Sequence, residues 1–211
     1  MKTILKTVPR LAEPPAEHEE KKSPAPEDAG MLNRLLASRT VIVSGQVDSE
    51  LAQKVIQQLV LLDHEDEARR ITLLINSPGG EVYSGFAIYD FVRYISAPVV
   101  SVVVGLAASM GTILALSVPK GSRYATPNSK FLIHQPLMTG YQGRAMDVEI
   151  QAKEILRDRD RLVDIYAECT GRPPKDIARD IDRDRWMSAQ EAREYGLVDR
   201  IIARRSELPK G

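Results

Sequence analysis

The sequence predicts an α/β fold built around parallel strands. Two segments, "ITLLINS" (71–77) and "PVVSVVVG" (98–105), are almost continuously apolar, which is typical of strands buried on both faces of a parallel sheet. Each is followed by a segment with helical patterning, so strand–turn–helix units recur along the chain. With 211 residues the chain is long enough for one domain with a sizeable core and too short for two comfortable ones.

The other elements follow from the same patterning. The first strand is expected at "RTVIVSG" (39–45), and the next helix is expected to begin at a cap formed by Asp48 or Ser49. Later helices are expected at "YSGFAIYDFVRYIS" (83–96), "TILALS" (112–117), about 144–170, after Pro173, and at "SAQEAREYG" (188–196). Extended pieces are expected at "SRYATPNS" (122–129), "KFLIH" (130–134) and "LVDRIIA" (197–203).

Composition divides the chain into three parts. Residues 9–29 contain five prolines among many Glu and Lys and almost no large apolar groups, so residues 1–30 are predicted to be a disordered tail. The folded domain is expected over residues 31–205, and residues 206–211 are expected to be a flexible C-terminus.

Charge and cysteine content narrow the function classes. The formal net charge is +0 at pH 7, which gives no electrostatic reason to expect nucleic acid or a membrane as a partner. A single cysteine, Cys169, excludes an intrachain disulfide and suits a reducing compartment. No apolar run reaches the roughly 18 residues of a membrane span, and the N-terminus lacks the apolar region of a secretory signal. We therefore expect a cytoplasmic protein.

A serine lies among small residues in "GLAASMG" (105–111), between two apolar stretches. One explanation is a tight strand-to-helix turn in which nothing larger than Gly or Ala fits. The other is a nucleophile, Ser109, held on a sharp turn with its hydroxyl exposed. Small residues at strand–helix junctions are common packing devices, so this segment alone does not decide between the two.

A nucleophilic serine needs a base, and histidine is the usual base near neutral pH. The chain has three histidines. His18 lies in the predicted tail and His64 at the polar end of a predicted helix, whereas His134 ends the apolar strand "KFLI". His134 is therefore the eligible base, although a histidine at the end of a strand is more often structural.

An oxyanion hole needs backbone N–H groups that point to one place. The segment "SPGGE" places Gly79 and Gly80 at the carboxyl end of a buried strand, where open α/β sheets bind ligands. The N–H of Met110, next to the serine at the start of a helix, is the natural second donor. A Pro-Gly-Gly turn is a weak signal by itself.

Four segments together resemble the ClpP family, the proteolytic subunits of Clp proteases: "INSPGGEVYSGFAIYD", "GLAASMG", "PNSKFLIHQP" and "RDIDRDRWMSAQEAREYGLVD". The resemblance extends from about Leu35 to Ile202. It implies a crotonase-like spiral of repeated β-β-α units with a protruding strand–helix handle at about 137–170.

The resemblance also implies a catalytic triad. The nucleophile corresponds to Ser109, the general base to His134 and the acid that orients the imidazole to Asp184. The chemistry of the sequence alone does not distinguish Asp184 from Asp180 or Asp182. The alternative role for Asp184 is an ion-pair network with the arginines on either side of it.

The oxyanion donors correspond to the N–H groups of Gly80 and Met110. A peptide substrate would pair as an added strand along "GGEVY" and the handle segment "TGYQGRA". The substrate-binding positions are Gly79, Glu81, Val82, Gly140 and Gly143. No metal and no cofactor is expected, because no His/Cys cluster has metal-ligand spacing and no Gly-rich loop precedes Lys-Ser or Lys-Thr.

The implied function is a serine endopeptidase that hydrolyses unfolded polypeptides inside a chamber of two stacked heptameric rings, joined through the handles. An ATP-dependent AAA+ unfoldase would use the ATP and feed the chamber. Two alternatives stay open. The chain could be a weakly active ring partner of a paralogous subunit, or another crotonase-fold enzyme such as an acyl-CoA hydratase or isomerase.

Three features depart from the family pattern. A Pro/Glu/Lys-rich tail replaces the usual apolar N-terminal segment, and the loop "QPLMTGYQG" (135–143) is about one residue longer than usual. Thr72 and Leu74 stand where many members have tyrosines that line the clefts for unfoldase loops. None of the three features involves the proposed catalytic residues. The tail and the absence of tyrosines at positions 72 and 74 argue against pairing with an unfoldase.

Overall fold

The computed structural model describes residues 26–137 and 143–209. In the described residues, the helices are α1 (Pro26–Ala37), α2 (Ser49–Glu65), α3 (Val82–Tyr94), α4 (Met110–Ala115), α5 (Ala145–Thr170), α6 (Pro174–Asp180), α7 (Ala189–Tyr195) and the 3₁₀ turn η1 (Arg205–Glu207). The strands are β1 (Thr40–Val47), β2 (Ile71–Gly80), β3 (Val99–Ala108), β4 (Arg123–Ala125), β5 (Lys130–Ile133), β6 (Arg185–Ser188) and β7 (Arg200–Ile201).

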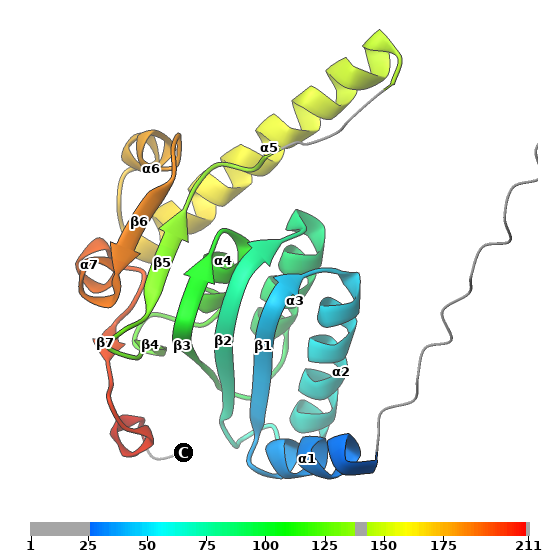
Figure 1. Ribbon diagram of the computed structural model, residues 1–211, viewed down its shortest axis with the longest axis vertical. Coiled ribbons are helices and arrows are strands. Elements are labelled where there is room, and N and C mark those ends of the chain that lie inside the picture. Colours follow the sequence, from blue (N-terminus) through cyan, green and yellow to red (C-terminus); the bar gives the residue numbers. More distant parts are fainter. Residues whose placement is uncertain (1–25, 138–142, 210–211) are drawn as a thin grey trace, which may run out of the picture.

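The strands form one mixed sheet whose main path is β1-β2-β3-β4-β7, with every pair along it parallel (Figure 1). Strand β3 is the branch point, because its first half pairs with β4 and its last three residues pair with β5. Strand β6 adds to β5 in the antiparallel direction. The sheet therefore splits at β3, and the branch formed by β5 and β6 leads toward the projecting helix α5.

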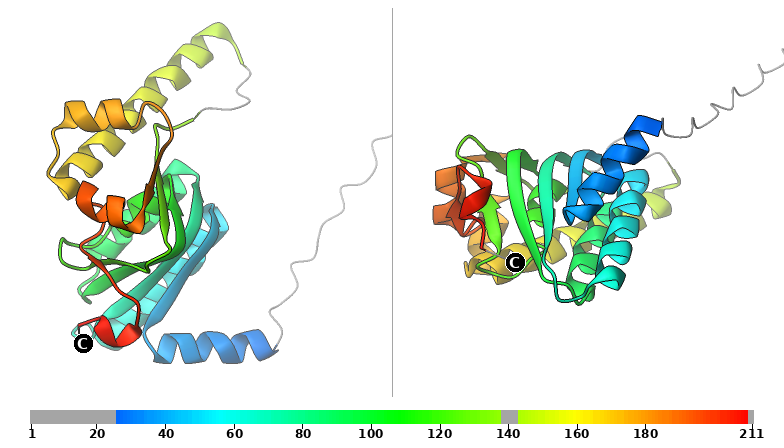
Figure 2. Two further views of the ribbon diagram at one scale, coloured as in Figure 1. Left: turned by 60° about the vertical axis from the view of Figure 1, so that its left-hand side comes forward. Right: turned by 90° about the horizontal axis from the view of Figure 1, so that it is seen from below.

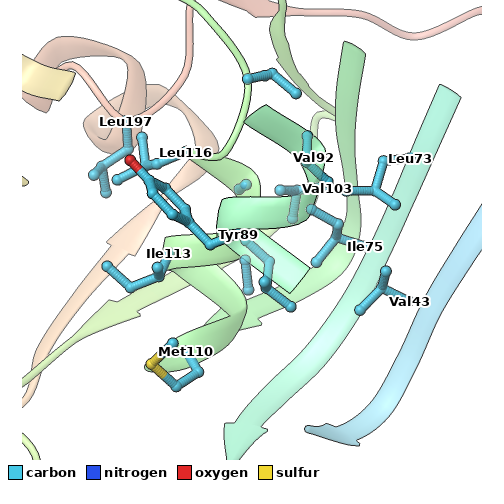
Figure 3. Close-up of a cluster of buried hydrophobic side chains, with 14 of the residues drawn as sticks. Val43, Leu73, Ile75, Tyr89, Val92, Val103, Met110, Ile113, Leu116 and Leu197 are labelled. Atoms are coloured by element: carbon cyan, nitrogen blue, oxygen red, sulfur yellow. The ribbon is translucent and has the colours of Figure 1, made fainter. Parts of the chain in front are cut away.

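Helices α2, α3 and α4 cover one face of the sheet (Figure 2). Side chains from the strands and from α3 and α4 meet there in a continuous apolar core (Figure 3), in which the labelled residues include Val43, Leu73, Ile75, Tyr89, Val92, Val103, Met110 and Ile113. Because Met110 belongs to this core, the residue directly after Ser109 is anchored in it.

The other face of the sheet is only partly covered. A smaller cluster of Val100, Val102, Tyr124 and Ile202 packs there, with Leu74 against it. Successive strand residues point to opposite faces, so Leu73 is fully buried while Leu74 is half-buried. The prediction that β2 is buried on both faces is therefore confirmed for the face that carries Leu73. The face that carries Leu74 is only partly buried.

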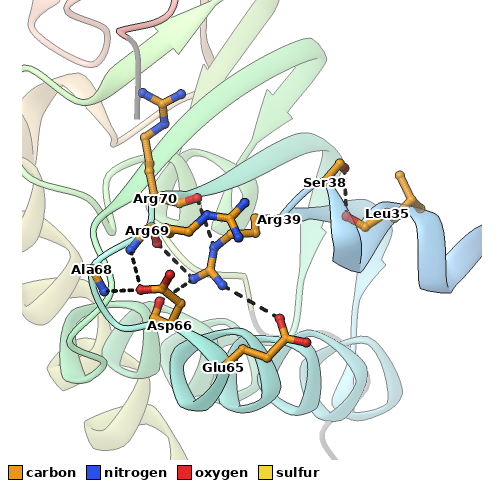
Figure 4. Close-up of polar contacts among 8 residues, drawn as sticks. All are labelled: Leu35, Ser38, Arg39, Glu65, Asp66, Ala68, Arg69 and Arg70. Atoms are coloured by element: carbon orange, nitrogen blue, oxygen red, sulfur yellow. Dashed lines mark hydrogen bonds and ion pairs between the residues drawn. The ribbon is translucent and has the colours of Figure 1, made fainter.

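Arg39 joins the start of β1 to the connection between α2 and β2 (Figure 4). Its Nη2 donates to the carbonyl oxygens of Asp66 and Arg69, at 2.9 Å each, and its Nε donates to that of Arg70 at 3.4 Å. Its Nη1 lies 3.9 Å from the carboxylate of Glu65. The buried guanidinium thus joins three carbonyl groups of this connection to the start of β1.

Both predicted domain boundaries differ from the structure. Helix α1 begins at Pro26, five residues before the expected start at Met31. A proline at the first helical position, followed by acidic residues, is a favourable helix start. At the other end, residues 206–209 are structured: the Glu207 carboxylate accepts from the backbone N–H groups of Ala203 and Arg204, and Leu208 packs against the smaller cluster. Residues 1–25 and 210–211 lie outside the described residues.

The predicted long helix is α5, and it forms a projection (Figure 1). Its buried residues all lie in its last nine positions, between Leu162 and Thr170, so only the C-terminal part packs on the domain. The projecting half carries exposed apolar side chains, namely Met146, Val148, Ile150 and Leu156. The strand expected beside it includes residues 138–142, which lie outside the described residues. In the described part of the chain, no helix is both long and apolar enough to cross a membrane.

Candidate active site

Ser109 forms a one-residue turn between β3 and α4. Strand β3 continues through Ala108 and α4 begins at Met110, so the turn is shorter than the expected segment 105–111. Ser109 has φ 54° and ψ −123°, a conformation that L-residues rarely adopt. Its side chain makes no capping hydrogen bond to α4. A strained serine whose hydroxyl is not used by the fold is typical of a functional position.

Gly79 packs directly against this turn. A Cβ added to Gly79 would lie 2.6 Å from the carbonyl oxygen of Ala108, 2.7 Å from the Cβ of Ser109 and 2.9 Å from the backbone N of Met110. Gly79 also has φ +90°, where a side chain is strained. The segment "SPGG" is therefore the end of β2 rather than a free turn. The small residues are needed for packing, and the same packing holds this glycine backbone beside the serine.

Strand β5 is tied to the serine turn by hydrogen bonds. The backbone N–H of Ser109 donates to the carbonyl oxygen of Leu132 at 2.9 Å. The buried hydroxyl of Thr112 lies 3.0 Å from the same oxygen and 2.8 Å from that of Ala107. These bonds hold the end of β5 beside the serine turn, and His134 follows Leu132 by two residues. Sequence reasoning missed Thr112, although a polar residue in an otherwise apolar run is a signal for it.

His134 and Asp184 lie at the adjoining ends of β5 and β6. The last antiparallel pair is Ile133 with Arg185, and the next pair in the same register would be His134 with Asp184. The Nδ1 of His134 is buried and has no hydrogen-bond partner among the described residues. Asp184 is exposed and forms no hydrogen bond or ion pair within that same part of the chain. The structure brings the two residues to neighbouring positions but does not join their side chains.

The ion pairs considered for Asp184 occur at Asp180 and Asp182 instead. Arg185 Nη1 lies 2.8 Å from the carboxylate of Asp180, whose side chain is only 9% exposed. The hydroxyl of Tyr195 donates to Asp180 at 2.9 Å. Burial, followed by this hydrogen bond, raises the pKa of Tyr195. Asp182 is exposed, with Arg183 Nε at 3.7 Å from its carboxylate. Asp180 is therefore engaged by the fold, and Asp184 is left without a structural partner.

The predicted substrate-binding positions lie in two places. Gly80 ends β2 and Glu81 follows it, exposed, with its carboxylate accepting from the hydroxyl of Ser84 at 2.7 Å. Val82 already belongs to α3, so only the first part of "GGEVY" is extended. Gly143 is exposed just before α5, and Gly140 lies outside the described residues.

Cys169 is a packing residue. It is 6% exposed, and its Sγ lies 3.7 Å from the carbonyl oxygen of Leu116. Burial raises the pKa of its thiol, which disfavours the reactive thiolate. Within the described residues, no group of three or more His, Cys, Asp or Glu side chains is placed to hold a metal ion.

The chain is similar to known proteins over most of its length. A family model described as Clp protease matches residues 25–205. The chain belongs to the Clp protease family. It is 47% identical over 188 residues to "ATP-dependent Clp protease proteolytic subunit 1" of Protochlamydia amoebophila, covering 88% of this chain and 91% of that protein. It is 48% identical over 170 residues to "ATP-dependent Clp protease proteolytic subunit" of Deinococcus radiodurans, covering 81% of this chain and 83% of that protein.

This membership confirms the resemblance and the crotonase-like α/β fold class predicted from the sequence. It favours the Clp protease prediction over another crotonase-fold enzyme. The assignments of individual site residues stay predictions.

Thr72 and Leu74, where the resemblance predicts tyrosines, line a groove of about 340 Å³ on the partly covered face of the sheet. Thr72 and Leu74 contribute to its wall, together with Leu35 from α1. Ile202 and Leu208, from the end of the chain, also line it. The C-terminal segment thus covers part of the surface at these positions.

Proposed function

We propose that the chain is the serine endopeptidase subunit of a Clp-type protease, and that it hydrolyses unfolded polypeptides. The observation that carries this proposal is the Ser109 turn. Its strained serine is packed on Gly79 and is hydrogen-bonded to β5, the strand that His134 directly follows.

In the proposed mechanism, the Oγ of Ser109 attacks the substrate carbonyl while His134 accepts its proton through Nε2. The tetrahedral intermediate carries an oxyanion, which the N–H groups of Gly80 and Met110 would stabilise. His134 then gives the proton to the leaving amine, and water repeats the cycle on the acyl-enzyme. Gly79 supports the mechanism by letting the glycine backbone approach the serine closely.

Asp184 completes the triad in this proposal. A buried Nδ1 without a partner is unfavourable, and a carboxylate on Nδ1 would hold the imidazole in the tautomer that accepts at Nε2. The ladder ends at the pair Ile133–Arg185, and one more pair in the same register would bring Asp184 opposite His134. We infer that the active form extends the ladder by this pair.

Assembly and partners are part of the same proposal. Exposed apolar side chains on the projecting half of α5 suit burial against another subunit, in rings that stack through their handles. A Clp ATPase would supply unfolded chains and use the ATP, while this chain would need no cofactor. The expected cytoplasmic location fits that role. A paralogous subunit is the alternative ring partner.

The test compares two serines at opposite ends of β3. We expect Ser109→Ala to abolish peptide hydrolysis and labelling by a fluorophosphonate probe, because removing a triad nucleophile costs several orders of magnitude in rate. Ser96→Ala, on the exposed loop before β3, should retain both. Near-normal turnover in Ser109→Ala would refute the proposal. The native mass of the isolated chain distinguishes a self-assembling subunit from one that requires a paralogue.

A further inference from the structure

A pocket of about 380 Å³ lies between the start of α3, the segment after β5 and the projecting half of α5. Two of its walls continue from the proposed active site. Val82 is two residues beyond Gly80, and Pro136 is two residues beyond His134. Consecutive Cα atoms are 3.8 Å apart, so each wall is within about 8 Å of a proposed active-site residue along the chain. A substrate side chain next to the scissile bond is within reach of this pocket.

The lining of the pocket has an apolar part and an acidic part. The apolar side chains are Val82, Pro136, Leu137 and Ile155. The polar side chains are Tyr83, Gln151, Glu154 and Asp158, of which the last three lie on α5. A long side chain with an aliphatic stem and a cationic head matches such a lining, because its stem packs on apolar walls and its head meets the carboxylates.

The charges around the pocket leave one carboxylate available. Glu154 is already paired with Arg157 on the same helix. The charge of Arg161 also acts on Tyr83, but its guanidinium lies 3.4 Å from the carboxylate of Asp90 and stacks over the ring of Phe86 at 4.2 Å.

Asp158 is half-buried and has no Lys or Arg partner among the residues that the structure describes. Its charge acts on Tyr83 and is the main cause that raises the pKa of that hydroxyl. A tyrosine with the ordinary pKa of 10.0 is protonated at neutral pH, so the Tyr83 hydroxyl can donate to the carboxylate. This contact leaves the negative charge of Asp158 uncompensated, and a cation entering the pocket would find it unpaired.

We propose that this pocket is a substrate subsite that selects lysine or arginine next to the scissile bond, with Asp158 and Tyr83 as the specificity-determining residues. The inference rests on the proposed peptidase function. It assigns to this chain a preference for cationic side chains, which depends on residues outside the proposed triad.

The test uses a library of unstructured peptides digested by the assembled protein, with every cleaved bond read by mass spectrometry. We expect Lys and Arg to exceed Leu at one position flanking the cleaved bonds by about fivefold in initial rate, since a partly exposed ion pair contributes up to about 1 kcal/mol. Added salt should reduce this ratio, because the pair is partly exposed. A wild-type protein that prefers Leu at both flanking positions would overturn the inference, whatever the variants do.

Two variants and a matched control sharpen the test. Asp158→Asn should abolish the preference for Lys and Arg, and Tyr83→Phe should reduce it. Asp160→Asn changes a 75% exposed carboxylate on the same helix and should leave the ratio unchanged. Cleavage that persists in Ser109→Ala would count against the proposed function itself. Cleavage that depends on Ser109, with the same ratio in Asp158→Asn as in wild type, would count against this subsite alone.

Discussion

The Cβ that Gly79 lacks would lie 2.7 Å from the Cβ of Ser109 and 2.6 Å from the carbonyl oxygen of Ala108. The end of β2 therefore packs so closely on the serine turn that position 79 affects both the packing of the fold and the position of the nucleophile. Any side chain at position 79 must move either its own backbone or the nucleophile.

We predict that Gly79→Ala lowers both stability and activity. Overpacking against backbone atoms costs about 1–3 kcal/mol and a left-handed φ on an L-residue costs about 1–2 kcal/mol more. Each 1 kcal/mol lowers the melting temperature of a chain of this size by roughly 2–4 °C. Thermal unfolding and peptide hydrolysis measure the two effects.

Gly121→Ala is the matched control, because Gly121 has φ +95° and nothing within 4 Å of an added Cβ. It should show only the backbone strain and keep its activity. Equal losses of stability in the two variants would show that the contact between Gly79 and the serine turn has no energetic role.

Two aspartates four residues apart should give opposite results. Asp184→Asn is expected to lower kcat/KM by about 10⁴-fold with little change in stability, because Asp184 is exposed and its proposed role is to orient His134. Asp180→Asn should lower stability by about 1.5–3 kcal/mol, because it weakens charged hydrogen bonds with Arg185 and Tyr195. Steady-state kinetics and thermal unfolding on both variants make the comparison. A catalytic loss confined to Asp180→Asn would mean that the acid was assigned to the wrong residue.

Most of the sheet could be predicted from the sequence, because β2 and β3 are continuous apolar runs with few other interpretations. Strand β6 was missed. Its sequence "RWMS" follows a run of charges, and it is held by pairing with β5, which lies about fifty residues away along the chain. Such a strand is determined by a distant partner and not by local propensity. Its alternation of exposed and buried side chains, with Trp186 exposed and Met187 buried, becomes clear only when the pairing with β5 is known.

The candidate site shows the same division. Ser109 and His134 could be selected by chemistry, since the turn and the strand end carry local signals. The choice among three nearby aspartates could not, because it depends on the register of β6 against β5. The separation of Asp184 from His134 likewise depends on where that ladder ends. The folded C-terminus was missed because the contacts of Glu207 outweigh a polar composition there, and the early start of α1 because a proline followed by acidic residues also suits a helix start.

Alkaline pH should destabilise the fold in a way that depends on Cys169. Burial raises the pKa of its thiol from the ordinary value of 9.0, so the unfolded chain ionises first as the pH rises. The stabilising contribution is complete below about pH 9 and is lost as the pH rises toward the folded pKa. Tyr89, whose pKa burial raises to about 12 from 10.0, acts in the same direction at higher pH.

We therefore expect Cys169→Ala to flatten the decline of unfolding free energy between pH 9 and 10, whatever its effect at neutral pH. Chemical denaturation at a series of pH values measures this slope. In the wild type, iodoacetamide should alkylate the thiol much faster in urea than in the native state. Rapid native alkylation at pH 8 would contradict the burial argument.

Docking of a Clp ATPase is expected to be weak when the ATPase comes from another organism. The groove formed in part by Thr72 and Leu74 offers no aromatic anchor at either position, and Leu208 occupies part of it. Aromatic side chains dominate interface energies, so their absence should weaken an interface substantially. We predict slow ATP-dependent degradation of a folded fluorescent substrate by the wild type with such an ATPase.

Replacing Thr72 and Leu74 with Tyr, together with deletion of residues 206–211, should increase the rate. Ser109→Ala in the same background controls for contaminating proteases. Rapid degradation by the wild type would show that this groove, as it stands, is sufficient for docking.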